Sequence, residues 1–91
     1  MNDLKDRIKN LQHRLEGACD LLGLEEERKK LAKLDKLQND QNFWEDRAKA
    51  TEVTKEISAI KNHLDKWDKI TDEINSLAEI IFTLSEDEKD L

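Results

Sequence analysis

The chain has 91 residues, of which 36% are hydrophobic and 42% are charged, and its formal net charge at pH 7 is −6. The hydrophobic share lies below the roughly 45–50% of a typical globular chain, a figure that also counts glycine, so a thick core is excluded. The negative charge does not favour direct binding to nucleic acid, which depends on clustered Lys and Arg. With no proline and two glycines, the composition is typical of long packed helices and predicts an all-α fold.

The sequence carries no signal for a membrane or for secretion. It contains no run of eighteen apolar residues and does not open with a charged and then apolar leader. We therefore expect neither a membrane-spanning segment nor a secretory signal. Cys19 is the single cysteine, which excludes an intrachain disulfide and fits a reducing compartment. The expected location is the cytoplasm, or an organelle interior if a transit peptide has been removed.

Residues 3–22 carry the first helical pattern. The apolar residues recur at alternating steps of four and three, at Leu4, Ile8, Leu11, Leu15, Ala18 and Leu22. A stripe of two apolar residues per heptad is typical of a helix that packs as in a coiled coil. Gly23 follows the last residue of this stripe and is expected to end the helix in the left-handed conformation.

A second helix is predicted over residues 24–38. It opens with three glutamates at residues 25–27, and acidic side chains are favourable beside the positive end of the helix dipole. Its apolar positions are Leu24, Leu31, Leu34 and Leu37. This helix is also expected to pack along one side.

The longest helix is predicted over residues 43–84, after a polar break at residues 39–42. Asn42 followed by Glu45 forms a capping box in which Asn replaces the usual Ser or Thr. The apolar seam of this helix consists of Val53, Ile57, Ile60, Leu64, Trp67, Ile70, Ile74, Leu77, Ile81 and Leu84. The step from Trp67 to Ile70 is three where the heptad requires four, which predicts a local register shift like a stammer.

The pattern after Leu84 predicts one more helix, over residues 85–91. Ser85 and Glu88 form a second capping box, and we expect the chain to be a domain of a longer protein. The first two helices together contain about as many residues as the third, so they reach back along most of it. The predicted architecture is a single domain over residues 1–91, an elongated antiparallel three-helix bundle resembling a coiled-coil hairpin. Self-association of this bundle is left open.

No group of residues predicts catalysis. His13 and His63 lie off the apolar stripes, and the inward-facing Glu-x-x-His motifs of metal-binding bundles are absent. There is also no Gly-rich loop for phosphate and no Ser, His and Asp set that thin helices would bring together. Cys19 is interpreted as a small hydrophobic residue at the edge of the first stripe. We expect a non-enzyme without cofactor or metal, in which Trp67 on the seam is a candidate contact for a partner.

Residues 22–46, with the sequence LGLEEERKKLAKLDKLQNDQNFWED, resemble the N-terminal helical domain of bacterial peptide chain release factors of type two. In that family a helix opening with Leu-Asp-Leu-Glu, or a close variant, leads through leucines to a Pro-Asp-Phe-Trp-x-Asp turn and a long helix. The matching positions are Leu22, Leu24, Glu25, Leu31, Leu34, Phe43, Trp44 and Asp46, and the likeness continues at Ala48, Leu64, Ile74, Leu77 and the acidic tail. Gln41 and Asn42 stand where the family has Pro and Asp. Because the leucines are heptad positions of any coiled coil, the specificity rests on the corner formed by Phe43, Trp44 and Asp46.

The resemblance implies a part in translation termination. In the family, other domains read the stop codon through Ser-Pro-Phe and promote hydrolysis of peptidyl-tRNA through Gly-Gly-Gln, and neither tripeptide occurs in this chain. The family assigns to the helical domain a docking role near the stalk base of the ribosome and communication with the recycling GTPase. The implied partner is therefore the ribosome, through a basic protein to which an acidic helical arm is suited.

A second interpretation is a stand-alone coiled-coil adaptor or dimerisation module unrelated to translation. The heptad stripes of residues 4–22 and 53–84 would also suit pairing between chains. In this interpretation the likeness at Phe43 and Trp44 is coincidental.

Overall fold

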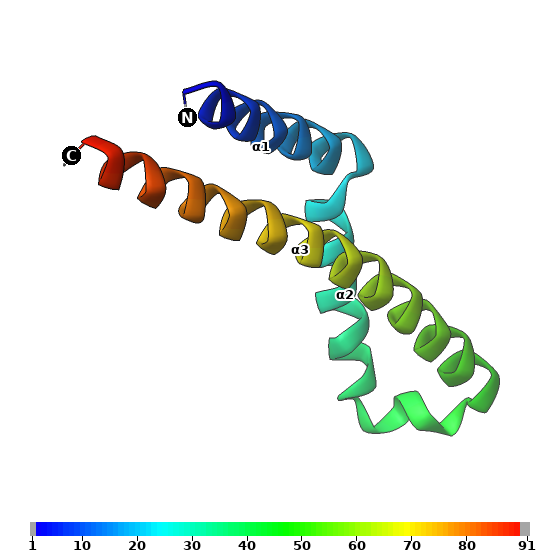
Figure 1. Ribbon diagram of the computed structural model, residues 1–91. Coiled ribbons are helices and arrows are strands. Elements are labelled where there is room, and N and C mark those ends of the chain that lie inside the picture. The colour runs from blue at the N-terminus through cyan, green and yellow to red at the C-terminus, as the bar shows by residue number, and fades with distance from the viewer. Residues whose placement is uncertain (1, 90–91) are drawn as a thin grey trace. The chain divides into compact units, whose positions relative to one another are not determined.

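The computed structural model describes residues 2–89, and this part of the chain is helical (Figure 1). In chain order its elements are α1 (Asn2–Leu22), α2 (Leu24–Gln38), the short 3-10 helix η1 (Gln41–Glu45) and α3 (Arg47–Lys89). No strand occurs within residues 2–89, so the predicted all-α fold is confirmed. The bounds of α1 and α2 lie within one residue of those predicted.

Gly23 separates α1 from α2. Its φ of 66° and ψ of 37° lie in the left-handed region, which glycine adopts without the steric cost that a Cβ would add. The backbone N–H of Glu27 donates to the carbonyl of Gly23 at 3.1 Å, so α2 starts immediately after this residue. Gly23 therefore ends the first helix as its position in the sequence predicted.

The chain divides into two compact units, one formed by Gly23–Lys66 and the other by Met1–Leu22 with Trp67–Leu91. The helix α3 contributes its first part to the former unit and its second part to the latter.

In Gly23–Lys66, α2 and the first part of α3 form an antiparallel helical hairpin. Three contacts fix the direction: Glu27 to His63, Lys30 to Glu56, and Gln38 to Thr54. The core of the hairpin contains Phe43, Ala50, Val53 and Ile57, with Leu31 and Leu34 packed against it. Ile60 and Leu64 are buried further along α3. The predicted coiled-coil-like hairpin is confirmed for this unit.

The beginning of α3 differs from the prediction. The helix starts at Arg47 rather than near residue 43, because residues 41–45 form the separate 3-10 helix η1. The predicted cap, Asn42, is inside η1, and two aspartates act as caps instead. Asp40 accepts a hydrogen bond from the backbone N–H of Asn42, and Asp46 accepts one from that of Lys49, each at 3.1 Å. At each of these positions the aspartate carboxylate accepts from a backbone N–H group at the start of a helix. No carbonyl of a preceding helical turn is available to that N–H group.

In the second unit, α1 runs antiparallel to the second part of α3. The Gln12 amide donates to the Asn75 side chain at 3.1 Å. Nearer the start of α1, the ammonium groups of Lys5 and Lys9 lie 5.5 and 5.7 Å from the ring centroid of Phe82. The order of these contacts along both helices sets the antiparallel direction.

The buried stripe of α3 keeps one register through both units, so the predicted shift at Ile70 is wrong. After Trp67 the half-buried positions include Ile70 as well as Thr71, Ile74 and Ile81, and the buried positions are Ala78 and Ser85. These two buried positions continue the earlier steps of four and three from Trp67 through Thr71, Ile74 and Ile81. Ala78 and Ser85 are only 4% and 5% exposed, whereas the predicted seam residues Leu77 and Leu84 are 47% and 48% exposed. The distance between packed helices depends on the size of the side chains at the contact. The small residues Ala78 and Ser85 occupy the buried face of α3, and Leu77 and Leu84 therefore lie beside it.

Residues 85–89 do not begin a new helix, because α3 continues without interruption to Lys89. Ser85 is buried within α3 and is not the cap of a further helix. Residues 90 and 91, the end of the predicted element, lie outside the described residues.

Candidate functional site

The corner between α2 and α3 is built by backbone hydrogen bonds that suit a tight turn. The N–H groups of Asn39 and Asp40 donate to the carbonyls of Lys36 and Leu37, each at 3.2 Å. The N–H of Phe43 then donates to the Asp40 carbonyl at 3.1 Å, opening η1. These bonds have the spacing of a 3-10 helix, which is frequent in short connectors. The corner therefore has a defined conformation that fixes its two aromatic residues.

Phe43 points into the hairpin. It is 8% exposed and belongs to the same core as Ala50, Val53 and Ile57. Its ring meets the Trp44 ring edge to face, with centroids 4.9 Å apart and planes at 89°, a favoured arrangement of aromatic pairs. Phe43 therefore anchors the corner to both helices.

Trp44 lies on the outside of the corner, with 57% of its surface exposed. Its indole N–H donates to the Gln38 carbonyl at 3.1 Å, and its ring contacts that of Phe43 in the T-shaped pair. The side chain is therefore held in one orientation although most of it faces solvent. The two adjacent aromatic residues therefore have opposite roles, because Phe43 lies in the core and Trp44 lies on the surface.

Asp46 is the N-cap of α3. Its carboxylate accepts from the N–H of Lys49 at 3.1 Å, and its carbonyl accepts the first helical bond, from the N–H of Ala50 at 2.9 Å. An N-cap aspartate typically contributes about 1 kcal/mol to helix stability. The three corner residues singled out in the sequence therefore lie together, each with a distinct structural role.

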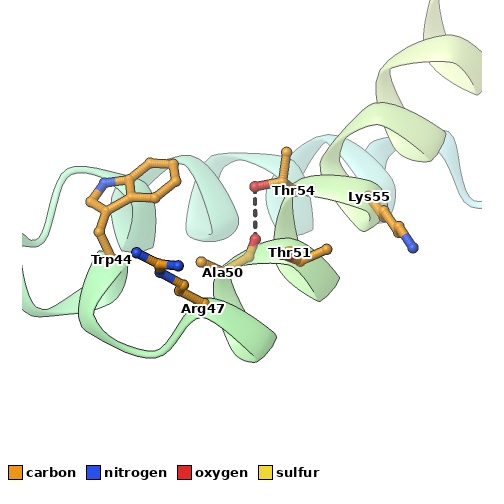
Figure 2. A pocket seen from close by; sticks show the side chains of 6 residues that line it. All are labelled: Trp44, Arg47, Ala50, Thr51, Thr54 and Lys55. Carbon is orange, nitrogen blue, oxygen red and sulfur yellow. Dashed lines mark hydrogen bonds between the residues drawn. The ribbon is translucent and has the colours of Figure 1, made fainter.

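An open hollow of about 420 Å³ lies beside Trp44. Figure 2 shows the six residues that line it, with Trp44 and Arg47 at one end and Lys55 at the other. Between these ends lie Ala50, Thr51 and Thr54. The Thr54 hydroxyl donates to the Ala50 carbonyl at 2.7 Å.

The hollow carries positive charge on a chain whose net charge is −6. Two of its six lining residues, Arg47 and Lys55, are cationic, and none is acidic. The acid Glu56, next to Lys55 in the sequence, is not among the lining residues and pairs with Lys30 of α2 at 2.6 Å. The electrostatic character of this surface is therefore opposite to that of the chain as a whole.

The other residues considered in the sequence are not among those that line the hollow. Trp67 is half-buried on α3, and its carbonyl accepts from the Thr71 hydroxyl at 2.9 Å. His63 pairs with Glu27 at 2.7 Å, whereas His13 is exposed on α1. Cys19 is half-buried in α1. The partner contact at Trp67 stays a prediction.

No group of three or more His, Cys, Asp or Glu side chains in residues 2–89 is arranged to hold a metal ion. Within the same range, no helix combines the length and apolar character needed to cross a membrane.

Sequence reasoning missed the four α3 residues of the hollow that have polar or cationic side chains. Arg47, Thr51, Thr54 and Lys55 follow one another at helical spacings of three and four or lie adjacent, which places them on one face. This face follows directly after Phe43 and Trp44 and contains no acid. A search for acid-free faces in an acidic helix would have found it.

Comparison with known proteins finds similarity to one class, the bacterial peptide chain release factors, over nearly all of the chain. The relatives bear the name peptide chain release factor 2. The protein of Borreliella burgdorferi is 32% identical over 87 residues, 96% of this chain and 24% of the relative. That of Petrotoga mobilis is 29% identical over 86 residues, 94% of this chain and 23% of the relative. That of Clostridium perfringens is 31% identical over 87 residues, 96% of this chain and 22% of the relative.

These similarities confirm the resemblance to type-two release factors that was drawn from residues 22–46. A match of 87 residues also covers most of α1. The resemblance drawn from the sequence rested on residue 22 and later positions and did not include this helix. The chain spans about a quarter of the length of the relatives, as a fragment or domain of release factor 2 would. No family model and no solved structure matches the chain.

Proposed function

We propose that this chain is a non-catalytic helical domain of a type-two peptide chain release factor and acts in translation termination. The observation that carries this proposal is the similarity to release factor 2 proteins across 91–96% of the chain. The Phe43 and Trp44 corner supports it, because this feature is not required by coiled-coil packing. The site of action is then the ribosome in the cytoplasm.

The proposed role of the domain is docking rather than chemistry. The sequence lacks the Gly-Gly-Gln and Ser-Pro-Phe tripeptides that the resemblance associates with hydrolysis and codon reading. The net charge of −6 suits contact with a basic protein near the stalk base of the ribosome, since complementary charge steers association. Communication with the recycling GTPase is a further part of this proposal. The stand-alone adaptor is not favoured, because similarity to one protein class covers nearly the whole chain.

A segment exchange tests this function. The matching segment of the Borreliella burgdorferi release factor 2 would be replaced by this chain, and stop-codon-dependent peptide release would be measured on ribosomes. A matched control would carry an unrelated helical hairpin of equal length. We expect the exchange to retain release and ribosome co-sedimentation, and the control to lose part of both. Equal loss in the two proteins would contradict the proposal.

A further inference from the structure

The hollow beside Trp44 has the properties of a protein-binding site. Trp44 is 57% exposed, yet its indole N–H is bonded to the Gln38 carbonyl and its ring is packed on Phe43. A tryptophan already fixed in orientation loses little conformational entropy when a partner covers it. Tryptophan and arginine are also the residue types most enriched among those that dominate binding energy at interfaces.

The lining residues define the chemistry of the partner. Ala50, Thr51 and Thr54 lie between the two cations, and the Trp44 ring lies at the Arg47 end. The Thr54 hydroxyl is bonded within its own helix. Arg47 and Lys55 are exposed at the two ends. This arrangement is complementary to an apolar side chain flanked on each side by a carboxylate.

The separation of the two cations defines the spacing of those carboxylates. Arg47 and Lys55 are eight residues apart on one helix, which corresponds to about 12 Å at the helical rise of 1.5 Å per residue. An extended peptide covers about 13 Å in four residues. Acidic residues four positions apart therefore match the two cations, with the apolar residue midway between them.

We propose that this hollow binds an acidic protein segment in which two carboxylates, four residues apart, flank an apolar side chain. This partner differs from the basic ribosomal protein of the proposed function, so the two proposals stand or fall separately. A nucleic acid strand carries a phosphate at every nucleotide and is therefore repelled by the overall charge of −6 more strongly than a segment with two carboxylates.

Fluorescence of Trp44 in the full chain provides the test. A Trp67→Phe background leaves Trp44 as the single tryptophan, and the probe is the peptide acetyl-Ser-Glu-Ser-Leu-Ser-Glu-Ser-amide. We expect a saturable change in emission as the peptide is added. A peptide with Lys in place of Glu, a peptide with Ser in place of Leu, and oligouridylate should each bind more weakly. Equal or tighter binding by any of these three probes would overturn the proposal.

Substitutions then locate the binding site. Replacement of the two cations by Arg47→Gln with Lys55→Gln should weaken binding by roughly fivefold, the effect of losing two exposed ion pairs. The matched control, Arg14→Gln with Lys33→Gln, makes the same change in net charge at exposed positions elsewhere and should leave affinity nearly unchanged. Circular dichroism would verify that both variants remain helical. Equal weakening in both, or weakening in neither, would refute the proposal.

Discussion

Neighbouring substitutions at Leu77 and Ala78 test which face of α3 packs against α1. The sequence pattern assigns Leu77 to the seam, whereas in the structure Leu77 is 47% exposed and Ala78 is 4% exposed. The change to glutamine at each position introduces the same polar side chain, which has good helix propensity. The two variants therefore introduce the same side chain at two positions that differ in burial.

The expected costs follow from that burial. Leu77→Gln removes an apolar side chain that is about half buried, and full burial of leucine contributes about 1.5–3 kcal/mol, so the expected loss is about 1 kcal/mol. Ala78→Gln forces a larger side chain into a packed site, at about 1–3 kcal/mol. It also buries an amide, which costs about 1–3 kcal/mol if the amide lacks a partner. The expected total for Ala78→Gln is about 3 kcal/mol.

Urea denaturation followed by circular dichroism at 222 nm measures both losses. The midpoint for Ala78→Gln should fall well below that of Leu77→Gln, with little difference in slope, since the slope reports the surface exposed on unfolding. The opposite order would show that Leu77 packs in the seam, and the register of the buried stripe would then be wrong.

Five further substitutions are expected to have measurable effects on unfolding free energy. Gly17→Ala should stabilise α1 by up to about 1 kcal/mol, because Gly17 is helical and a Cβ there meets nothing within 4 Å. The same change at Gly23, whose φ is 66°, should destabilise by about 1 kcal/mol because its backbone is left-handed. Asp46→Ala should cost about 1 kcal/mol through loss of the cap of α3. Phe43→Ala should cost about 3–5 kcal/mol as a core truncation, whereas Trp44→Ala should cost about 2 kcal/mol through loss of one hydrogen bond and an edge contact.

Thermal or urea unfolding of each purified variant measures these differences against the parent chain. Destabilisation by Gly17→Ala would show that α1 is interrupted at this residue. An unchanged unfolding midpoint for Asp46→Ala would show that Asp46 does not stabilise α3 as its cap. Equal losses for Phe43→Ala and Trp44→Ala would contradict their opposite burial.

Much of the local structure could be predicted because its causes are local. Gly23 ends α1 through its own backbone freedom. The corner at Phe43, Trp44 and Asp46 could be located from residue order, since short polar residues favour turns and caps. The prediction that Asn42 caps the long helix was wrong, because Asn42 and Asp46 both have side chains suited to a cap and the pattern favoured the first. The 3-10 helix over residues 41–45 decided in favour of Asp46.

The sequence by itself determined that this protein is helical, where α1 and α2 begin and end, and which corner carries its distinguishing aromatic residues. Helical periodicity and capping depend on neighbours within a few positions along the chain. The tertiary structure decided that Ala78 rather than Leu77 is buried, and that Phe43 is buried while Trp44 is exposed. These outcomes depend on which stripe of a helix meets a segment far away in sequence. The cationic hollow beside Trp44 exists for the same reason, because it forms only when the corner folds against the first turns of α3.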